Sequence, residues 1–156
     1  MRRGSRIFDA PSSVRIPRGG KGLLEWFLAQ PDAGVVEGYT DYAWNGVTTL
    51  QFAELCRRIV LERAFDRIRD ESPIHHFCPN RPLSKYEMLQ TFEREFRRTV
   101  RVTPVRSPGG PTRRILATRF RCLRELFGDA LDFTQAVRDL SVLRGPGVSV
   151  AVEVPR

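Results

Sequence analysis

The sequence predicts an α/β fold of four to five helices joined by short strands. Two long stretches, 49–64 and 84–97, carry apolar residues at three-to-four spacing behind a helix-capping motif, which is typical of amphipathic helices. Short apolar or alternating runs at 35–36, 74–78 and 100–103 lie next to Pro or Gly, which favours strands. Helices that alternate with strands along a chain are typical of the α/β class.

The 156 residues fit one domain with a leader and a tail. Residues 1–21 are rich in Arg, Pro, Gly and Ser and lack periodicity, so we expect a basic, flexible leader. The folded lobe is predicted to span 22–143. In the tail, 144–156, valines alternate with other residues from Val148 to Val154, which predicts an edge strand.

In the first half of the lobe, residues 22–30 (GLLEWFLAQ) are predicted to form a short apolar helix, which a turn at 31–34 closes. Thr48 and Gln51 form a capping box at the start of the helix 49–64. The residues that recur on one face of this helix are Phe52, Leu55, Cys56, Ile59 and Val60.

The helix 84–97 has the clearest local signal. Ser84 is its expected N-cap, Glu87 completes the capping box, and Leu83 is expected to pack against Met88 as a hydrophobic staple. These features fix where the helix begins.

Two further helices are expected towards the C-terminal end. The strand 100–103 is predicted to end at Pro104. Beyond it, Thr118 is the expected cap of a helix that Gly128 stops, and Asp132 is the expected cap of another.

The charge of the chain is positive and unevenly distributed. The net charge is +8, and residues 94–124 contain ten Arg with Glu95 as their one acidic residue. Such a segment attracts phosphates, whether on nucleic acid or on a small nucleotide. The excess of Arg over Lys has a second interpretation, which is the coding composition of the gene.

Cysteine usage and hydropathy predict a cytoplasmic protein. Cys56, Cys78 and Cys122 are an odd number within apolar patterns, which favours free thiols in a reducing compartment. No apolar run approaches the length of a membrane span, and the Arg-rich start lacks the apolar stretch of a signal peptide.

Local catalytic and metal motifs are missing from the sequence. Gly19–Gly22 and Gly109–Gly110 lack the spacing of a phosphate-cradling loop, and no nucleophile elbow is present. In a strand, His76 and Cys78 would share one face while His75 points away, and two ligands fall short of a zinc site. We therefore expect no metal, and a binding protein rather than a complete enzyme.

Two segments are candidates for ligand binding. Residues 39–49 place two Tyr, a Trp and an Asn in a loop before a helix N-terminus, where aromatic faces and N–H groups favour an anionic ligand. Residues 110–119 contain an Arg pair and a third Arg, and guanidinium groups bind phosphate oxygens bidentately. A core Trp in a turn and a solvated basic face are the alternatives that remain open.

Four blocks in this order resemble a known family. They are GLLEWFLAQ (22–30), YAWNGVTTLQFAEL (42–55), HHFCPNRPLSKYEML (75–89) and RRILATR (113–119). Together they resemble the substrate-binding, C-terminal half of dTDP-4-dehydrorhamnose reductase-like proteins, within the extended short-chain dehydrogenase/reductases. The resemblance covers about residues 22–143.

The resemblance implies a small α/β lobe that closes over a nucleotide-activated sugar while a Rossmann lobe holds NAD(P)H for reduction of a 4-keto sugar in polysaccharide biosynthesis. The cofactor loop and Tyr-x-x-x-Lys pair of the family have no counterpart here, so we expect a truncated protein that binds no cofactor and is inactive alone. Such a protein works with a separate Rossmann-domain chain or not at all. The site residues that the resemblance implies are Trp44, Asn45, Gly46, Arg113 and Arg114. A small basic nucleic-acid-binding module is the alternative function, although no recognised motif favours nucleic acid.

Overall fold

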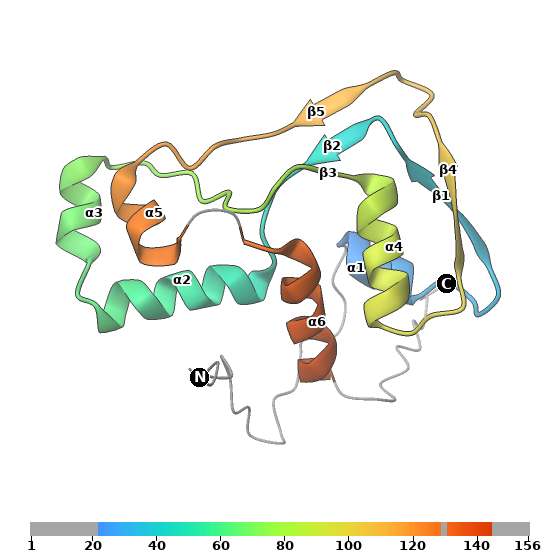
Figure 1. Cartoon of the computed structure of the whole chain (residues 1–156), viewed down its shortest axis with the longest axis horizontal. Helices are drawn as coiled ribbons and strands as arrows, with labels where there is room; N and C mark the ends of the chain where they lie inside the picture. Colours follow the sequence, from blue (N-terminus) through green and yellow to red (C-terminus); the bar gives the residue numbers. More distant parts are fainter. Residues whose placement is uncertain (1–21, 129–130, 145–156) are drawn as a thin grey trace, which may run out of the picture.

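The computed structural model describes residues 22–128 and 131–144, and these form a mixed α/β fold with two groups of elements (Figure 1). The first group comprises α1 (Leu23–Leu28), β1 (Val35–Tyr39), α4 (Lys85–Glu95), β4 (Arg101–Val105) and α6 (Phe133–Arg144). The second group comprises α2 (Thr49–Leu61), α3 (Phe65–Glu71) and α5 (Arg121–Phe127). Three further short strands lie in the upper middle of the view of Figure 1: β2 (Tyr42–Trp44), β3 (Leu83–Ser84) and β5 (Thr112–Arg114).

The strands form two small sheets. In the first, β1 and β4 pair in parallel, with Val35 opposite Arg101 and Tyr39 opposite Val105. In the second, β2 lies between its antiparallel neighbour β3 and its parallel neighbour β5. Because β2 is the central strand, its residues position both edges of this sheet.

The helix α4 organises the first hydrophobic core. Ser84 and Glu87 form the expected capping box, and both members of the expected staple are buried. The helix contacts β1, β4, α1 and α6. The core residues are Phe27, Val36, Leu83, Met88, Leu89, Phe92, Val100, Phe133 and Val137.

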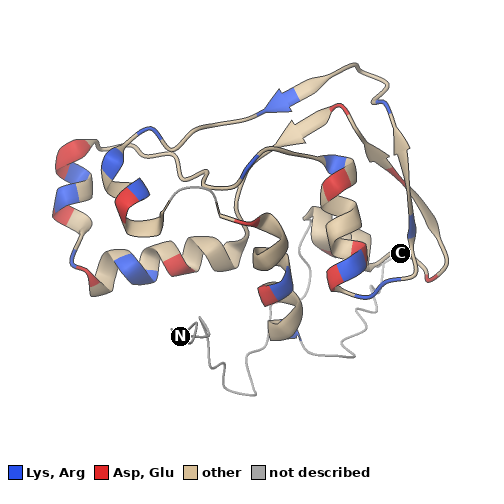
Figure 2. Cartoon of the chain, in the orientation of Figure 1, with Lys and Arg blue, Asp and Glu red and all other residues tan. Residues whose placement is uncertain are grey.

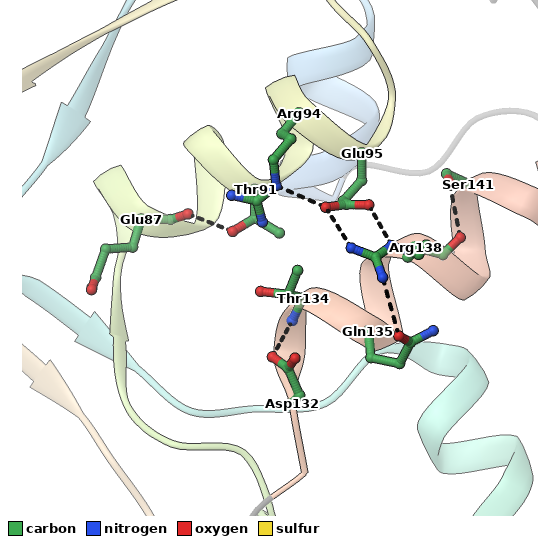
Figure 3. Close-up of polar contacts among 9 residues, drawn as sticks. All are labelled: Glu87, Thr91, Arg94, Glu95, Asp132, Thr134, Gln135, Arg138 and Ser141. Atoms are coloured by element: carbon green, nitrogen blue, oxygen red, sulfur yellow. Dashed lines mark hydrogen bonds and ion pairs between the residues drawn. The ribbon is translucent and has the colours of Figure 1, made fainter. Parts of the chain in front are cut away.

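A polar contact ties α4 to α6. Glu95 accepts hydrogen bonds from Arg94 on its own helix and from Arg138 on α6 (Figure 3). The N–O distance is 2.8 Å for Arg94 and 2.9 Å for Arg138. At the start of α6, Asp132 accepts a hydrogen bond from the backbone N–H of Thr134, which confirms Asp132 as a cap. The two helices are therefore held by charge at one end as well as by apolar packing.

A second, smaller core lies between α2, α3 and α5. Its buried members are Leu55, Ala64, Leu123 and Leu126, with Ile59, Ile68, Phe77 and Phe127 packed around them. The capping box of Thr48 and Gln51 begins α2, as the sequence predicts. The helix ends before the predicted position 64, because Arg63 adopts a left-handed conformation with φ of 51°. No described helix has the length and apolarity that crossing a bilayer requires.

The predicted strand 74–78 is absent, and that prediction was wrong. Within the described residues this segment has no neighbouring strand with which to pair, and its groups bond elsewhere. Phe77 packs edge-on against Phe127 with ring centroids 4.8 Å apart. The backbone N–H of Cys78 donates to the hydroxyl of Thr118 over 2.9 Å.

The predicted capping role of Thr118 was also wrong, because its hydroxyl is used by Cys78. Helix α5 starts after Phe120, which provides no side-chain cap. The carboxylate of Glu71, at the end of α3, instead accepts hydrogen bonds from the backbone N–H groups of Arg121 and Cys122. The helix ends at Gly128, with φ of 80°, as expected.

Other predicted elements differ from the observed ones in number or length. The sequence predicts four to five helices and the described chain has six, since α3 was not predicted. Strand β4 continues through Pro104 to Val105, where the missing N–H of proline is tolerated because β4 pairs on one side only. The predicted leader at 1–21 and most of the predicted tail, including Val148–Val154, lie outside the described residues.

Candidate functional site

The pairing of β2 with β5 brings the two predicted ligand-binding segments together. Ala43 lies opposite Arg113, and Trp44 lies opposite Arg114, although about seventy positions separate them in the sequence. The predicted site residues therefore lie on two neighbouring strands and on the turn that follows the first of them. This arrangement was not predictable from either segment alone.

The two arginines lie on opposite faces of the sheet. Successive residues of a strand point to alternate faces, and laterally paired residues share a face. Arg114 therefore shares a face with Trp44 and Tyr42, and its guanidinium carbon lies 5.6 Å from the centroid of the Tyr42 ring. Arg113 shares the other face with Ala43. A ligand that contacts Trp44 can reach Arg114 far more readily than Arg113.

Both arginines carry charge that the described protein does not neutralise. Neither forms an ion pair with a described carboxylate, and both are exposed. Figure 2 shows the end of β5 as basic, whereas the paired strand β2 carries no charged residue. Other arginines of the basic segment, such as Arg94 and Arg121, have carboxylate partners. Two adjacent arginines without a described carboxylate partner therefore lie on β5.

Trp44 serves both the sheet and the first core. Its side chain is half-buried, and its ring meets that of Phe133 edge-on with centroids 6.4 Å apart. Gly46 lies so close that a Cβ at this position would overlap the six-membered ring of Trp44. Close packing against Trp44 therefore explains the glycine without any ligand.

Asn45 extends the pairing of β2 and β5 with its side chain. Its amide N–H₂ donates to the carbonyl of Leu116 over 2.7 Å, and its carbonyl oxygen accepts from the N–H of Leu116 over 3.0 Å. Only 6% of Asn45 is exposed. In this structure the Asn45 amide is thus committed to the backbone and holds the chain after β5 in place.

Asn80 is a buried residue that the sequence did not single out. Its amide donates to the carbonyl of Gly46 over 2.7 Å and exchanges hydrogen bonds with the side-chain amide of Gln51. Gln51 also accepts from the backbone N–H of Thr48. Thr48 and Gln51 were recognisable as a capping box, but the part played by Asn80 depends on contacts across 29 to 34 positions.

Two cavities lie near this network. One, of about 210 Å³, is bounded by α2 and α6 and includes Glu54, Arg58 and Asp139 in its lining. The other, of about 200 Å³, is lined in part by Leu116 and Arg124. Pockets for complete small molecules commonly have about 300–1,000 Å³. Each cavity is therefore smaller than such a pocket, and the lining of neither one includes a predicted site residue.

Of the two histidines at 75 and 76, His75 is held by structural contacts and His76 is exposed. The Nε2 of His75 lies 2.9 Å from the carbonyl oxygens of both Ile68 and Ser72, so this nitrogen carries the proton and donates. Burial raises the pKa of the Cys78 thiol, which disfavours the thiolate that metals bind. The described residues contain no cluster of three or more His, Cys, Asp or Glu side chains suited to a metal ion.

The described fold is of the mixed α/β class, and comparison with known proteins finds a likeness of fold to a solved structure. No family model and no curated protein matches the sequence. One similar solved structure is a dTDP-4-dehydrorhamnose reductase from Clostridium acetobutylicum, with a TM-score of 0.58 and 14% identity. The match covers 81% of this chain and 45% of the reductase chain. The likeness at this identity is one of fold, and the chain spans less than half the length of that reductase.

Proposed function

We propose that this chain is the nucleotide-sugar-binding part of an NAD(P)H-dependent 4-keto-sugar reductase of polysaccharide biosynthesis, and that a separate Rossmann-domain chain supplies the cofactor site. The observation that carries the proposal is the parallel pairing of β2 with β5, which sets Trp44 beside Arg114. The fold likeness to a reductase that acts, by its name, on a dTDP-linked sugar supports the same assignment.

In this proposal Arg114 binds the diphosphate of the ligand. A guanidinium group forms paired hydrogen bonds with phosphate oxygens, and Arg114 is exposed without a described carboxylate partner. Tyr42 supports the guanidinium from one side, and Trp44 offers its exposed portion to the base or sugar. Asn45 and Gly46 act indirectly, because they fix the turn that follows Trp44.

The described residues do not fit a dinucleotide cofactor. The turn between β2 and α2 contains a single glycine, Gly46, and the Trp44 ring occupies the space that a Cβ at this position would take. The Gly109–Gly110 turn lies between two strands and precedes no helix. In this proposal hydride transfer takes place on the second chain, and we assign no catalytic step to the residues described.

The experiment is a calorimetric titration of the protein with dTDP, followed by the same titration of Arg114→Ala and Arg113→Ala. Loss of a charge-assisted phosphate contact costs about 1.5–3 kcal/mol, so Arg114→Ala is expected to weaken binding by about tenfold to a hundredfold. Arg113→Ala removes the same charge from the next position of the same strand and is the matched control, with an expected change below about threefold.

The opposite results would count against the proposal. Equal losses in the two variants would show that net charge, and not the face shared with Trp44, determines binding. Absence of dTDP binding, together with tight duplex DNA binding that weakens steeply between 50 and 200 mM salt, would favour the nucleic-acid alternative.

A further inference from the structure

Asn45 and Gly46 form the only Asn-Gly pair in the sequence, and packing accounts for both residues. The side chain at position 45 both donates and accepts, because Asn45 bonds to the carbonyl and to the N–H of Leu116. Position 46 needs glycine, because a Cβ there would overlap the ring of Trp44. The turn after β2 therefore contains a dipeptide with a chemical reactivity of its own.

That reactivity is deamidation, which makes asparagine one of the thermolabile residues. The backbone nitrogen of the following residue attacks Cγ of the asparagine, so that a new C–N bond closes a five-membered imide while the Cγ–Nδ2 bond breaks. The amide leaves as ammonia and takes the proton of the backbone nitrogen with it. Water then opens the imide to aspartate or isoaspartate. Glycine favours the attack because it has no side chain in the way and the most flexible backbone.

Both reacting groups are held in place in the folded chain. The amide of Asn45 is tied to Leu116 by hydrogen bonds of 2.7 and 3.0 Å, and only 6% of Asn45 is exposed. The carbonyl of Gly46 accepts a hydrogen bond of 2.7 Å from Asn80, and the ring of Trp44 lies against the same glycine. An amide that turns towards the nitrogen of Gly46 gives up both hydrogen bonds to Leu116. The reaction therefore needs the chain to open locally first.

We propose that Asn45–Gly46 is a deamidation site which the pairing with Leu116 protects, and that opening of the chain after β5 allows an irreversible conversion there. The aspartate product cannot donate to the carbonyl of Leu116, so a carboxylate faces a carbonyl where 6% of the residue is exposed. The isoaspartate product lengthens the backbone by one carbon before Gly46. Either product prevents the original pairing with Leu116 from forming again.

The sequence contains a matched internal control for this reaction. Asn80 is the only other asparagine, it is followed by Arg81, and it is buried as deeply as Asn45, with 4% exposed. The unmodified chain is incubated in buffer and in urea at one pH and temperature, and peptide mass spectrometry follows conversion of amide to acid at both positions. In urea, Asn45 is expected to convert well before Asn80. In buffer, conversion of Asn45 is expected to be slower than in urea by about tenfold or more.

Two proline variants test whether the contact with Leu116 provides the protection. Leu116→Pro removes the N–H that donates to Asn45, at a residue that is 53% exposed and lies outside the helices and strands. It is expected to speed the conversion in buffer by about fivefold or more, because a buried acceptor loses its partner. Ala117→Pro places the same ring at the next exposed position and should leave the rate unchanged. Circular dichroism of both variants is compared with that of the unmodified chain.

Asn45→Asp tests the consequence of the reaction, because it places one product in the chain from the start. Hydrogen exchange at the N–H of Leu116 is expected to be faster in this variant than in the unmodified chain. The proposal is overturned if Asn45 converts no faster than Asn80 in urea, if folding leaves the rate at Asn45 unchanged, or if Asn45→Asp leaves Leu116 equally protected. If a variant fails to fold, the comparison of buffer with urea on the unmodified chain decides. No ligand enters any of these measurements, so their outcome is independent of the proposed function.

Discussion

The buried carboxylate of Glu54 gives a sharp prediction about acid stability. Glu54 lies on the inward side of α2 and accepts hydrogen bonds from Arg57 and Arg58. Arg58 in turn donates to the carbonyl of Leu126 and covers the ring of Phe127, so the carboxylate holds the arginine that fastens α2 to α5. We expect Glu54→Gln to loosen this contact while preserving side-chain volume.

The magnitude follows from the ionisation of the carboxyl group. Hydrogen bonds from Arg57, opposed by burial and reinforced by Arg58, lower the pKa of Glu54 from 4.5 to about 2. A shift of this size sets an upper limit of about 3 kcal/mol on the stabilisation. Because 48% of the Arg57 side chain is exposed, solvent screening reduces the expected contribution to about 1–2 kcal/mol.

The sign of the pH dependence is fixed by the direction of the shift. The pKa is lower in the folded state, so the stabilisation is present above the unfolded value of 4.5 and is lost as the pH falls towards 2. In urea unfolding, the difference between the unmodified chain and Glu54→Gln should be about 1–2 kcal/mol at pH 7 and should shrink below pH 4.5.

Glu62→Gln is the matched control, since Glu62 is the exposed C-cap residue of the same helix and has no described ion pair. We expect this control to change the free energy of unfolding by less than about 0.5 kcal/mol. A Glu54→Gln difference that is absent at pH 7, or that stays constant from pH 7 to pH 3, would refute the reasoning.

Two further predictions concern the first core. Gly38→Ala should lower the free energy of unfolding by about 2 kcal/mol, because a Cβ at this position would lie 2.8 Å from the Cα of Tyr86 and would force α4 away from β1. The control is Gly109→Ala, which should be nearly neutral because a Cβ there has no neighbour within 4 Å. Glu95→Gln should lower the free energy of unfolding in urea by about 1 kcal/mol at pH 7, because hydrogen bonds from Arg138 and Arg94 lower the pKa of Glu95. This difference should diminish as the pH falls below the ordinary range of a carboxyl group. A larger effect from Glu93→Gln, on the same helix, would contradict the second prediction.

Local capping signals in the sequence were sufficient for three of the six described helix starts. The capping boxes at Thr48 and Ser84 and the cap at Asp132 involve residues within three positions of one another, so the sequence alone displays them. The start of α5 could not be found in this way. Its cap is Glu71, fifty positions earlier, and no pattern near Thr118 reveals that distant carboxylate.

Strands were predictable only where a partner exists within the described fold. Val35 and Val36 lie in β1, which pairs with β4, and both strands were expected. The segment 74–78 has equally apolar residues, but no described strand lies beside it, and a strand is defined by its neighbour. Strand β5 was not predicted because two of its three residues are charged. These residues form a strand because they pair with β2.

The candidate site illustrates why residue type alone is a poor guide to role. Asn45 and Asn80 look alike in the sequence as polar residues near a turn. Both are buried, and each side-chain amide donates a hydrogen bond to a backbone carbonyl. A buried amide that loses its partner costs about 1–3 kcal/mol, so these contacts constrain the turn after Trp44 strongly. The rigid turn sets where the exposed part of Trp44 lies relative to Arg114. Under the proposed function, preorganisation of this kind raises the affinity of Arg114 for the ligand, because it lowers the entropy lost on binding.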